Sequence, residues 1–120
     1  MDKDSVQQII DVSDKLTVLN TQKLRAKEKF ESNTIVGFNG GLFKVNESLL
    51  VYVSYLLQNG KQADTVVLDH NQNPILLKSV RDFNNTIQDA YYSALDIYHN
   101  DIKELDRLKN SVTRYFDLES

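Results

Sequence analysis

The chain has no cysteine and no tryptophan among its 120 residues, and only one proline and four glycines. Without cysteine, a disulfide framework, thiolate chemistry and a cysteine-ligated zinc site are excluded. The two histidines, His70 and His99, have no second histidine or cysteine at ligand spacing, so neither predicts a metal site. We therefore predict no metal site and no cofactor.

Long apolar runs are also missing. The longest, residues 49–57, is broken by Ser54 and is too short to cross a bilayer. The polar N-terminus, MDKDSVQQ, lacks the apolar segment of a signal peptide. We therefore expect an intracellular protein with no membrane contact.

The balance of charge argues against a nucleic-acid partner. The formal net charge is −3, and a phosphate-backbone binder normally presents a basic face. The one basic cluster is interspersed with Glu28 and Glu31, as expected for a solvated helix face; it comprises Lys23, Arg25, Lys27 and Lys29.

Residues 1–33 predict a long helix. Neither proline nor glycine occurs between Ser5 and Phe30, and Ser5 and Gln8 have the spacing of a capping box. Apolar side chains recur at alternating spacings of three and four, with one interruption at Lys23, which places them on one seam. They are Ile9, Val12, Leu16, Leu19, Ala26 and Phe30.

Residues 79–120 predict a second, longer helix, with a capping-box spacing at Ser79 and Asp82. Its apolar stripe shifts by one residue after Ile97. Lys109 occupies one of the later stripe positions, where an apolar residue would be expected. The stripe comprises Val80, Phe83, Ile87, Ala90, Ala94 and Ile97, then Tyr98, Ile102, Leu105 and Val112, ending at Tyr115 and Phe116. Glu104 with Arg107, and Asp106 with Lys109, are expected surface pairs. We predict an antiparallel coiled coil whose shared seam includes Leu16, Leu19, Ile102 and Leu105, with Tyr91, Tyr92 and Tyr98 in helix packing.

Three of the four glycines lie within residues 37–41, between two β-branched and aromatic runs. Asn39-Gly40 between such runs predicts a tight hairpin turn, because these residues tolerate positive φ. Gly41 would suit an adjacent bulge, and Gly37 a point of close backbone approach.

A second hairpin is predicted across residues 65–78, where the turn formers DHNQNP separate two apolar runs. Between the hairpins, Asn46 can cap a short helix that Asn59-Gly60 would end. This helix is apolar nearly all round, which 120 residues can cover only in part, so we predict that it forms a subunit interface. The candidate interface residues are Leu49, Leu50, Tyr52, Val53, Tyr55 and Leu56.

No catalytic residue is predicted. GFNGG lacks the spacing and the Lys-Ser/Thr pair of a phosphate-binding loop. DHNQN begins like a calcium loop, but Pro74 and Val80 occupy the positions that require glycine and glutamate. Asp69 beside His70 could be half of a catalytic pair, although no nucleophile motif accompanies it.

Two resemblances bear on function. The order long helix, hairpin structure, longer helix is similar to that of prefoldin chaperones, whose helices form a coiled-coil arm and whose hairpins assemble into a barrel. The helix of residues 47–59 departs from that pattern. Separately, GFNGGLFKV followed by a helix and VVLDHNQNPI resembles small uncharacterised proteins of large tailed marine phages. That likeness implies a virion, assembly or host-takeover role.

The sequence thus predicts one α+β domain with two long antiparallel helices flanking two hairpins and a short apolar helix. Its parts are residues 1–33, 34–78 and 79–120. The expected function is that of a non-enzymatic, self-assembling structural protein whose partner is itself, or another protein. Two alternatives stay open: a small β-barrel that closes the two hairpins and binds RNA or DNA, and a hydrolase using Asp69 and His70.

Overall fold

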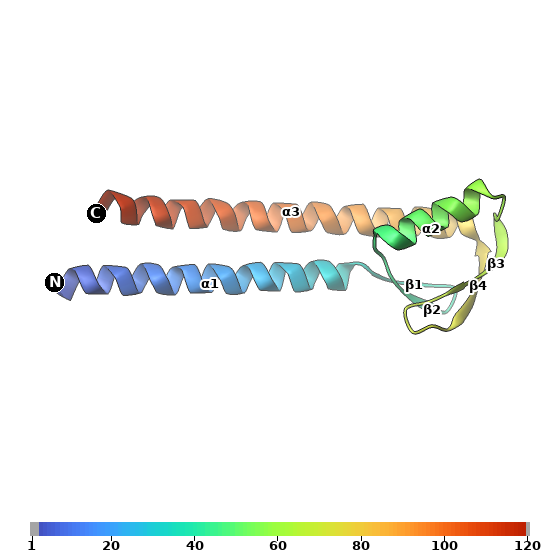
Figure 1. Ribbon diagram of the computed structural model, residues 1–120, viewed down its shortest axis with the longest axis horizontal. Coiled ribbons are helices and arrows are strands. Elements are labelled where there is room, and N and C mark those ends of the chain that lie inside the picture. The colour runs from blue at the N-terminus through green and yellow to red at the C-terminus, as the bar shows by residue number, and fades with distance from the viewer. Residues whose placement is uncertain (1–2, 120) are drawn as a thin grey trace. The chain divides into compact units, whose positions relative to one another are not determined.

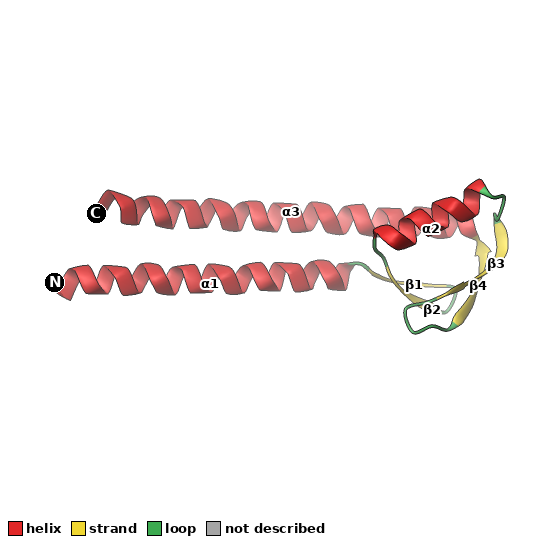
Figure 2. Ribbon diagram, viewed as in Figure 1, coloured by secondary structure: helices red, strands yellow, loops and turns green. Residues whose placement is uncertain are grey.

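The computed structural model describes residues 3–119 and contains three helices and two antiparallel two-stranded sheets (Figures 1 and 2). The predicted α+β class and the order of its elements are confirmed. In chain order the elements are α1 (Lys3–Asn33), β1 (Ile35–Phe38), β2 (Gly41–Lys44), α2 (Glu47–Gln58), β3 (Ala63–Leu68), β4 (Pro74–Ser79) and α3 (Val80–Glu119).

The chain divides into two units. The first, called the helical unit here, contains residues 1–29 and 97–120; the second, called the mixed unit, contains residues 30–96. Each long helix contributes to both units, and both sheets and α2 belong to the mixed unit.

Two ion pairs show how the helices run in the helical unit. Lys23 Nζ lies 2.7 Å from Asp106 Oδ1, and Lys29 Nζ lies 3.5 Å from Asp101 Oδ2. The later residue on α1 pairs with the earlier residue on α3, so the two segments are antiparallel, as predicted. Lys23, which interrupts the apolar seam, thus reaches a carboxylate on the other helix.

The seam of α1 is visible in its burial. Val12 and Leu16 are half-buried and Leu19 and Ala26 are buried, whereas the intervening described positions, apart from half-buried Lys23, are exposed. The predicted seam position Ile9 is 46% exposed, so the prediction for Ile9 was wrong. On α3 the seam continues from buried Ala94 to half-buried Tyr98, and Ile97 is exposed, so the prediction for Ile97 was wrong. The predicted seam positions Val112, Tyr115 and Phe116 lie outside the described side chains.

The predicted N-terminal capping residues are present on two of the three helices. The Asp82 amide donates to Ser79 Oγ at 3.2 Å, which confirms the cap of α3, and the Leu49 amide donates to Asn46 Oδ1 at 2.9 Å, which confirms the cap of α2. Helix α1 already includes Ser5, so this residue does not precede the helix as a cap would. Helix α2 ends at Asn59 and Gly60, as predicted, with Gly60 at φ +78°.

The core lies in the mixed unit and is built around α3 residue Phe83. Its ring centroid lies 5.1 Å from that of Phe38 and 4.7 Å from that of Phe43, so both strands of the first hairpin pack against it. The fully or nearly buried members of this core are Phe43, Val45, Val53, Leu56, Val67, Leu77, Val80, Phe83 and Ile87. One cluster thus joins both hairpins, α2 and the first turns of α3.

The first hairpin confirms the predicted turn but corrects two glycine roles. Asn39 and Gly40 have φ of +48° and +82°, as a two-residue hairpin turn requires. Gly41 pairs directly with Phe38, so no bulge occurs there. A Cβ on Gly41 would lie 2.6 Å from Ile75 Cγ1, whereas a Cβ on Gly37 would meet nothing closer than 3.9 Å. The close approach therefore occurs at Gly41 and not at Gly37.

The second hairpin pairs β3 with β4 in the register Val66↔Leu76 and Leu68↔Pro74. The two hairpins form separate sheets within residues 3–119, so the barrel required by the nucleic-acid alternative is not formed by the described strands. Individual hydrogen bonds join them instead: the Lys78 amide donates to Asn39 Oδ1 at 3.3 Å and the His70 amide donates to the Leu42 carbonyl at 2.7 Å.

Candidate interaction surface

Helix α2 buries one face in the mixed unit. Val53 is fully buried and Leu56 nearly so, while Leu49 and Leu50 pack against the same core. These four members of the predicted interface are therefore directed toward the chain's own core. The core around Phe83 covers Val53 and Leu56 and part of Leu49 and Leu50.

The opposite side of α2 is exposed and apolar. Val51 is 68% exposed, Tyr52 46% and Tyr55 59%, and Tyr92 on α3 is 58% exposed. Val51, Tyr55 and Tyr92 line one open groove of about 370 Å³, and Tyr52 lines a neighbouring one with Val51 and Tyr55. These four residues are called the tyrosine surface below.

The tyrosine surface exposes several large aromatic side chains together. With about 200 Å² for a whole tyrosine side chain, three tyrosines at these exposures leave roughly 300 Å² in water. The largest apolar patch on a typical monomer covers about 300–600 Å² and often has a function. Tyrosine is also enriched at protein–protein interfaces, because its ring buries much apolar area while its hydroxyl keeps a polar contact.

Tyr92 is supported by its neighbour on α3. The ring of Tyr91 contacts that of Tyr92 edge to face, with centroids 5.9 Å apart, and on its other side it approaches Phe30 at 6.3 Å. Burial raises the pKa of the Tyr91 hydroxyl above its usual value, and the Glu47 carboxylate raises it further. Tyr91 is thus a packing residue, as predicted. Tyr92 was predicted to pack between helices in the same way, but its side chain is 58% exposed.

Asp69 organises the turn of the second hairpin. Its Oδ1 accepts hydrogen bonds from the Asn71 and Asn73 amides, both at 2.9 Å, and its Oδ2 accepts one from the Leu42 amide at 3.1 Å. The bonds from Asn73 and Leu42 lower the pKa of Asp69, so the buried carboxylate stays charged. Both oxygens thus bind backbone amides, while the His70 side chain is exposed. This arrangement gives Asp69 a structural role between the hairpins.

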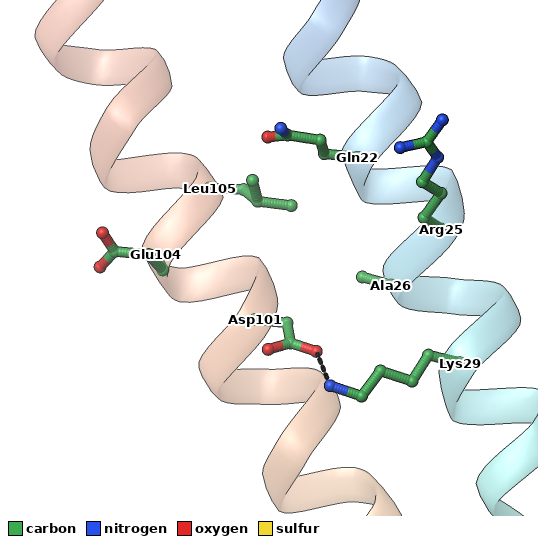
Figure 3. A pocket seen from close by; sticks show the side chains of 7 residues that line it. All are labelled: Gln22, Arg25, Ala26, Lys29, Asp101, Glu104 and Leu105. Atoms are coloured by element: carbon green, nitrogen blue, oxygen red, sulfur yellow. Dashed lines mark hydrogen bonds and ion pairs between the residues drawn. The ribbon is translucent and has the colours of Figure 1, made fainter.

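The helical unit contains a shallow groove at Ala26, of about 280 Å³, which Figure 3 shows with Leu105 directed from α3 toward α1. The ion pairs place residues 101–106 level with residues 23–29, so Ile102 and Leu105 lie opposite the segment around Ala26. Leu16 and Leu19 occupy layers further toward the N-terminus of α1. The four predicted seam residues are all buried or half-buried, but they do not share one layer.

The basic cluster of α1 is partly engaged within the chain. Lys23 binds Asp106, and Lys29 binds Asp101 (dashed line in Figure 3). On α3 the predicted pair of Glu104 and Arg107 is present, with Arg107 Nε 3.1 Å from a Glu104 carboxylate oxygen. Asp106 pairs with Lys23, where the sequence led us to expect Lys109.

Within the described part of the chain, no three histidine, aspartate or glutamate side chains converge as a metal site would require. No helix in the part searched is both long and apolar enough to span a membrane. Comparisons with models of protein families, with curated proteins and with solved structures gave no match to this chain.

Proposed function

We propose that this chain is a non-enzymatic structural or assembly protein that associates with copies of itself through the tyrosine surface. The observation that carries the proposal is the two-sided character of α2: its leucine face completes the core, and its tyrosine face is left in water. A helix that only closed a core would normally present polar side chains to solvent.

The size of the surface fits the centre of an interface. Roughly 300 Å² of tyrosine is less than the ~800 Å² that each partner buries in a typical stable complex. The remaining area would come from the rim, where Glu47, Ser48 and Gln58 surround the tyrosines. An aromatic centre with a polar rim is the usual composition of such interfaces.

The proposal includes a role as a phage-encoded or chaperone-like protein, because the sequence resembles proteins of both kinds. It takes support from the helical unit, where two ion pairs join antiparallel helices, because the resemblance to prefoldins implies a coiled-coil arm. A hexameric barrel of the prefoldin kind would need the hairpins to pair between subunits, and the two separate two-stranded sheets leave strand edges for such pairing.

The proposal is tested by replacing Tyr52 and Tyr55 together with lysine and measuring mass by light scattering on a sizing column. We expect a lower mass than the parent with unchanged helical content by circular dichroism, because both side chains are exposed in the single chain. The matched control replaces Ser32 and Asn85, two exposed helical residues of the mixed unit, with lysine. It adds the same two charges, so it should keep the parent's mass. A double tyrosine variant with the parent's mass would remove the tyrosine surface from the interface.

A further inference from the structure

The outward face of the second hairpin is apolar. Successive side chains of a strand point to opposite faces of its sheet, and Val67 and Leu77 are the ones buried in the core. Their neighbours on the other face are exposed although they are apolar. They are Val66 at 58%, Leu68 at 59% and Leu76 at 47%, with exposed Pro74 paired to Leu68. These four residues are called the hairpin face below.

The hairpin face differs from the usual outer face of a two-stranded sheet. An antiparallel sheet with one face in water normally alternates apolar inward and polar outward side chains. Near-continuous apolar runs, such as residues 66–68 and 74–77, are typical of strands covered on both faces. Val66 lies directly opposite Leu76, so their side chains form one patch across the two strands. The strands therefore have the composition of a sheet that is covered on its outside as well.

One acid and one base lie at one end of the hairpin. Asp64 and Lys78 are both exposed and lie at the end away from the turn. The residue pairs on either side of them place Asp64 across from Lys78. Each hairpin thus carries opposite charges on its two strands at one end and apolar side chains along the rest of its outer face.

These charges indicate which surface would cover the hairpin face. A second copy, turned by a half rotation about an axis parallel to the strands, would place its β3 over β4 of the first copy with the charged ends level. Asp64 of each copy would then meet Lys78 of the other, and apolar side chains would meet apolar side chains. A half rotation about an axis across the strands would instead place both charges over the apolar end, where they would lose water without gaining a partner. The first arrangement also keeps the strands of the two sheets nearly aligned, as packed sheets commonly are.

The tyrosine surface of another copy is a poorer match for the hairpin face. Among the described residues that line its two grooves, Glu47 is acidic and none is basic. Asp64 would therefore have no base to meet there. The hairpin face is complementary to itself, because each copy supplies both the acid and the base.

We propose that the hairpin face packs against the same face of a second copy, with the two-fold axis parallel to the strands and Asp64 of each chain beside Lys78 of the other. This contact lies on β3 and β4 and does not depend on the tyrosine surface of α2. Two separate two-fold contacts on one chain would let it assemble beyond a dimer. Four apolar side chains per chain make a small contact, so the contact is weak and is tested at high protein concentration.

Charge reversal on two different chains tests the proposed orientation. Both chains carry Tyr52→Lys and Tyr55→Lys, so that the tyrosine surface does not contribute, and light scattering measures their mass. The chain with Asp64→Lys has two bases at the end of its hairpin, and the chain with Lys78→Asp has two acids. Each alone should have the mass of a single chain because like charges meet, whereas an equal mixture should form dimers.

The matched control makes the same changes of charge on α1. Glu28→Lys and Lys15→Asp alter two exposed positions of that helix by the same amounts. In the same double tyrosine background, these two chains should dimerise alone as the background does, and mixing them should not raise the mass. Circular dichroism verifies that every variant keeps its helical content.

Leu76→Lys tests the apolar part of the contact. Its side chain is half exposed in the single chain, so the variant should fold. In the double tyrosine background it should have the mass of a single chain. An unchanged mass in this variant, or no rise in mass when the Asp64→Lys and Lys78→Asp chains are mixed, would overturn the proposal. A double tyrosine background that is a single chain at every concentration would also overturn it. Failure of the proposed function is a different result, because it appears as an unchanged mass when the tyrosines alone are replaced.

Discussion

The close approach at Gly41 gives the sharpest test of the fold, because a second glycine four residues away provides its control. A Cβ at Gly41 would lie 2.6 Å from Ile75 Cγ1 and 2.9 Å from Phe43 Cε2. Phe43 is almost fully buried and cannot move freely. Gly41→Ala should therefore overpack the contact between the hairpins and lower the free energy of unfolding by about 1–3 kcal/mol.

Gly37→Ala should instead raise the free energy of unfolding. Its added Cβ meets nothing closer than 3.9 Å, and its φ is not in the left-handed region. The alanine restricts the unfolded chain, so stability should rise by about 0.4–1 kcal/mol. Chemical denaturation followed by circular dichroism measures both variants on the same chain.

A double-mutant cycle identifies the atoms responsible. Ile75→Ala removes the Cγ1 and Cδ1 atoms that the new methyl group would meet, so Gly41→Ala should cost about 1 kcal/mol less in that background than in the parent. The contact with Phe43 would remain. If Gly41→Ala proves at least as stable as Gly37→Ala, the packing of the second hairpin on the first is wrong as described.

Two further predictions concern the helices and the second turn. Leu105→Asp places a charge at a half-buried seam position and should cost about 1–3 kcal/mol, whereas Lys103→Asp at an exposed position should be nearly silent; equal melting temperatures would refute the seam. Asp69→Asn should lower the melting temperature at neutral pH, because an amide offers one acceptor oxygen where the carboxylate accepts three backbone hydrogen bonds. Since these bonds lower the pKa of Asp69 in the folded chain, its stabilisation is complete above the ordinary pKa and is lost as the pH falls through the folded value. The parent should therefore lose stability more steeply than Asp69→Asn below about pH 5, and parallel pH profiles would contradict this role.

Local chemistry made most of the fold predictable. Asn39-Gly40 defines its turn through backbone preferences alone, and Asn46 and Ser79 cap their helices through bonds that span three residues. The seam on α1 follows from a spacing visible in the sequence. Each of these features depends on neighbours within a few positions along the chain.

The features that could not be predicted depend on contacts between distant segments. Whether Gly41 or Gly37 is closely approached depends on Ile75 in the other hairpin. Which side of α2 faces water depends on a core supplied by Phe83 and the strands. Because α2 is apolar on both sides, its sequence does not show which side is buried. The leucine face was therefore included in the predicted interface, although it belongs to the core.

We propose that the functional protein is an assembly of several copies of this chain. The mass of the unmodified protein in solution tests this proposal most directly. Light scattering across a dilution series should give a mass of at least twice the 13.8 kDa of one chain at high concentration, falling on dilution if the contacts are weak. A mass of 13.8 kDa at every concentration would contradict self-assembly, and the exposed tyrosines of α2 would then require a different partner.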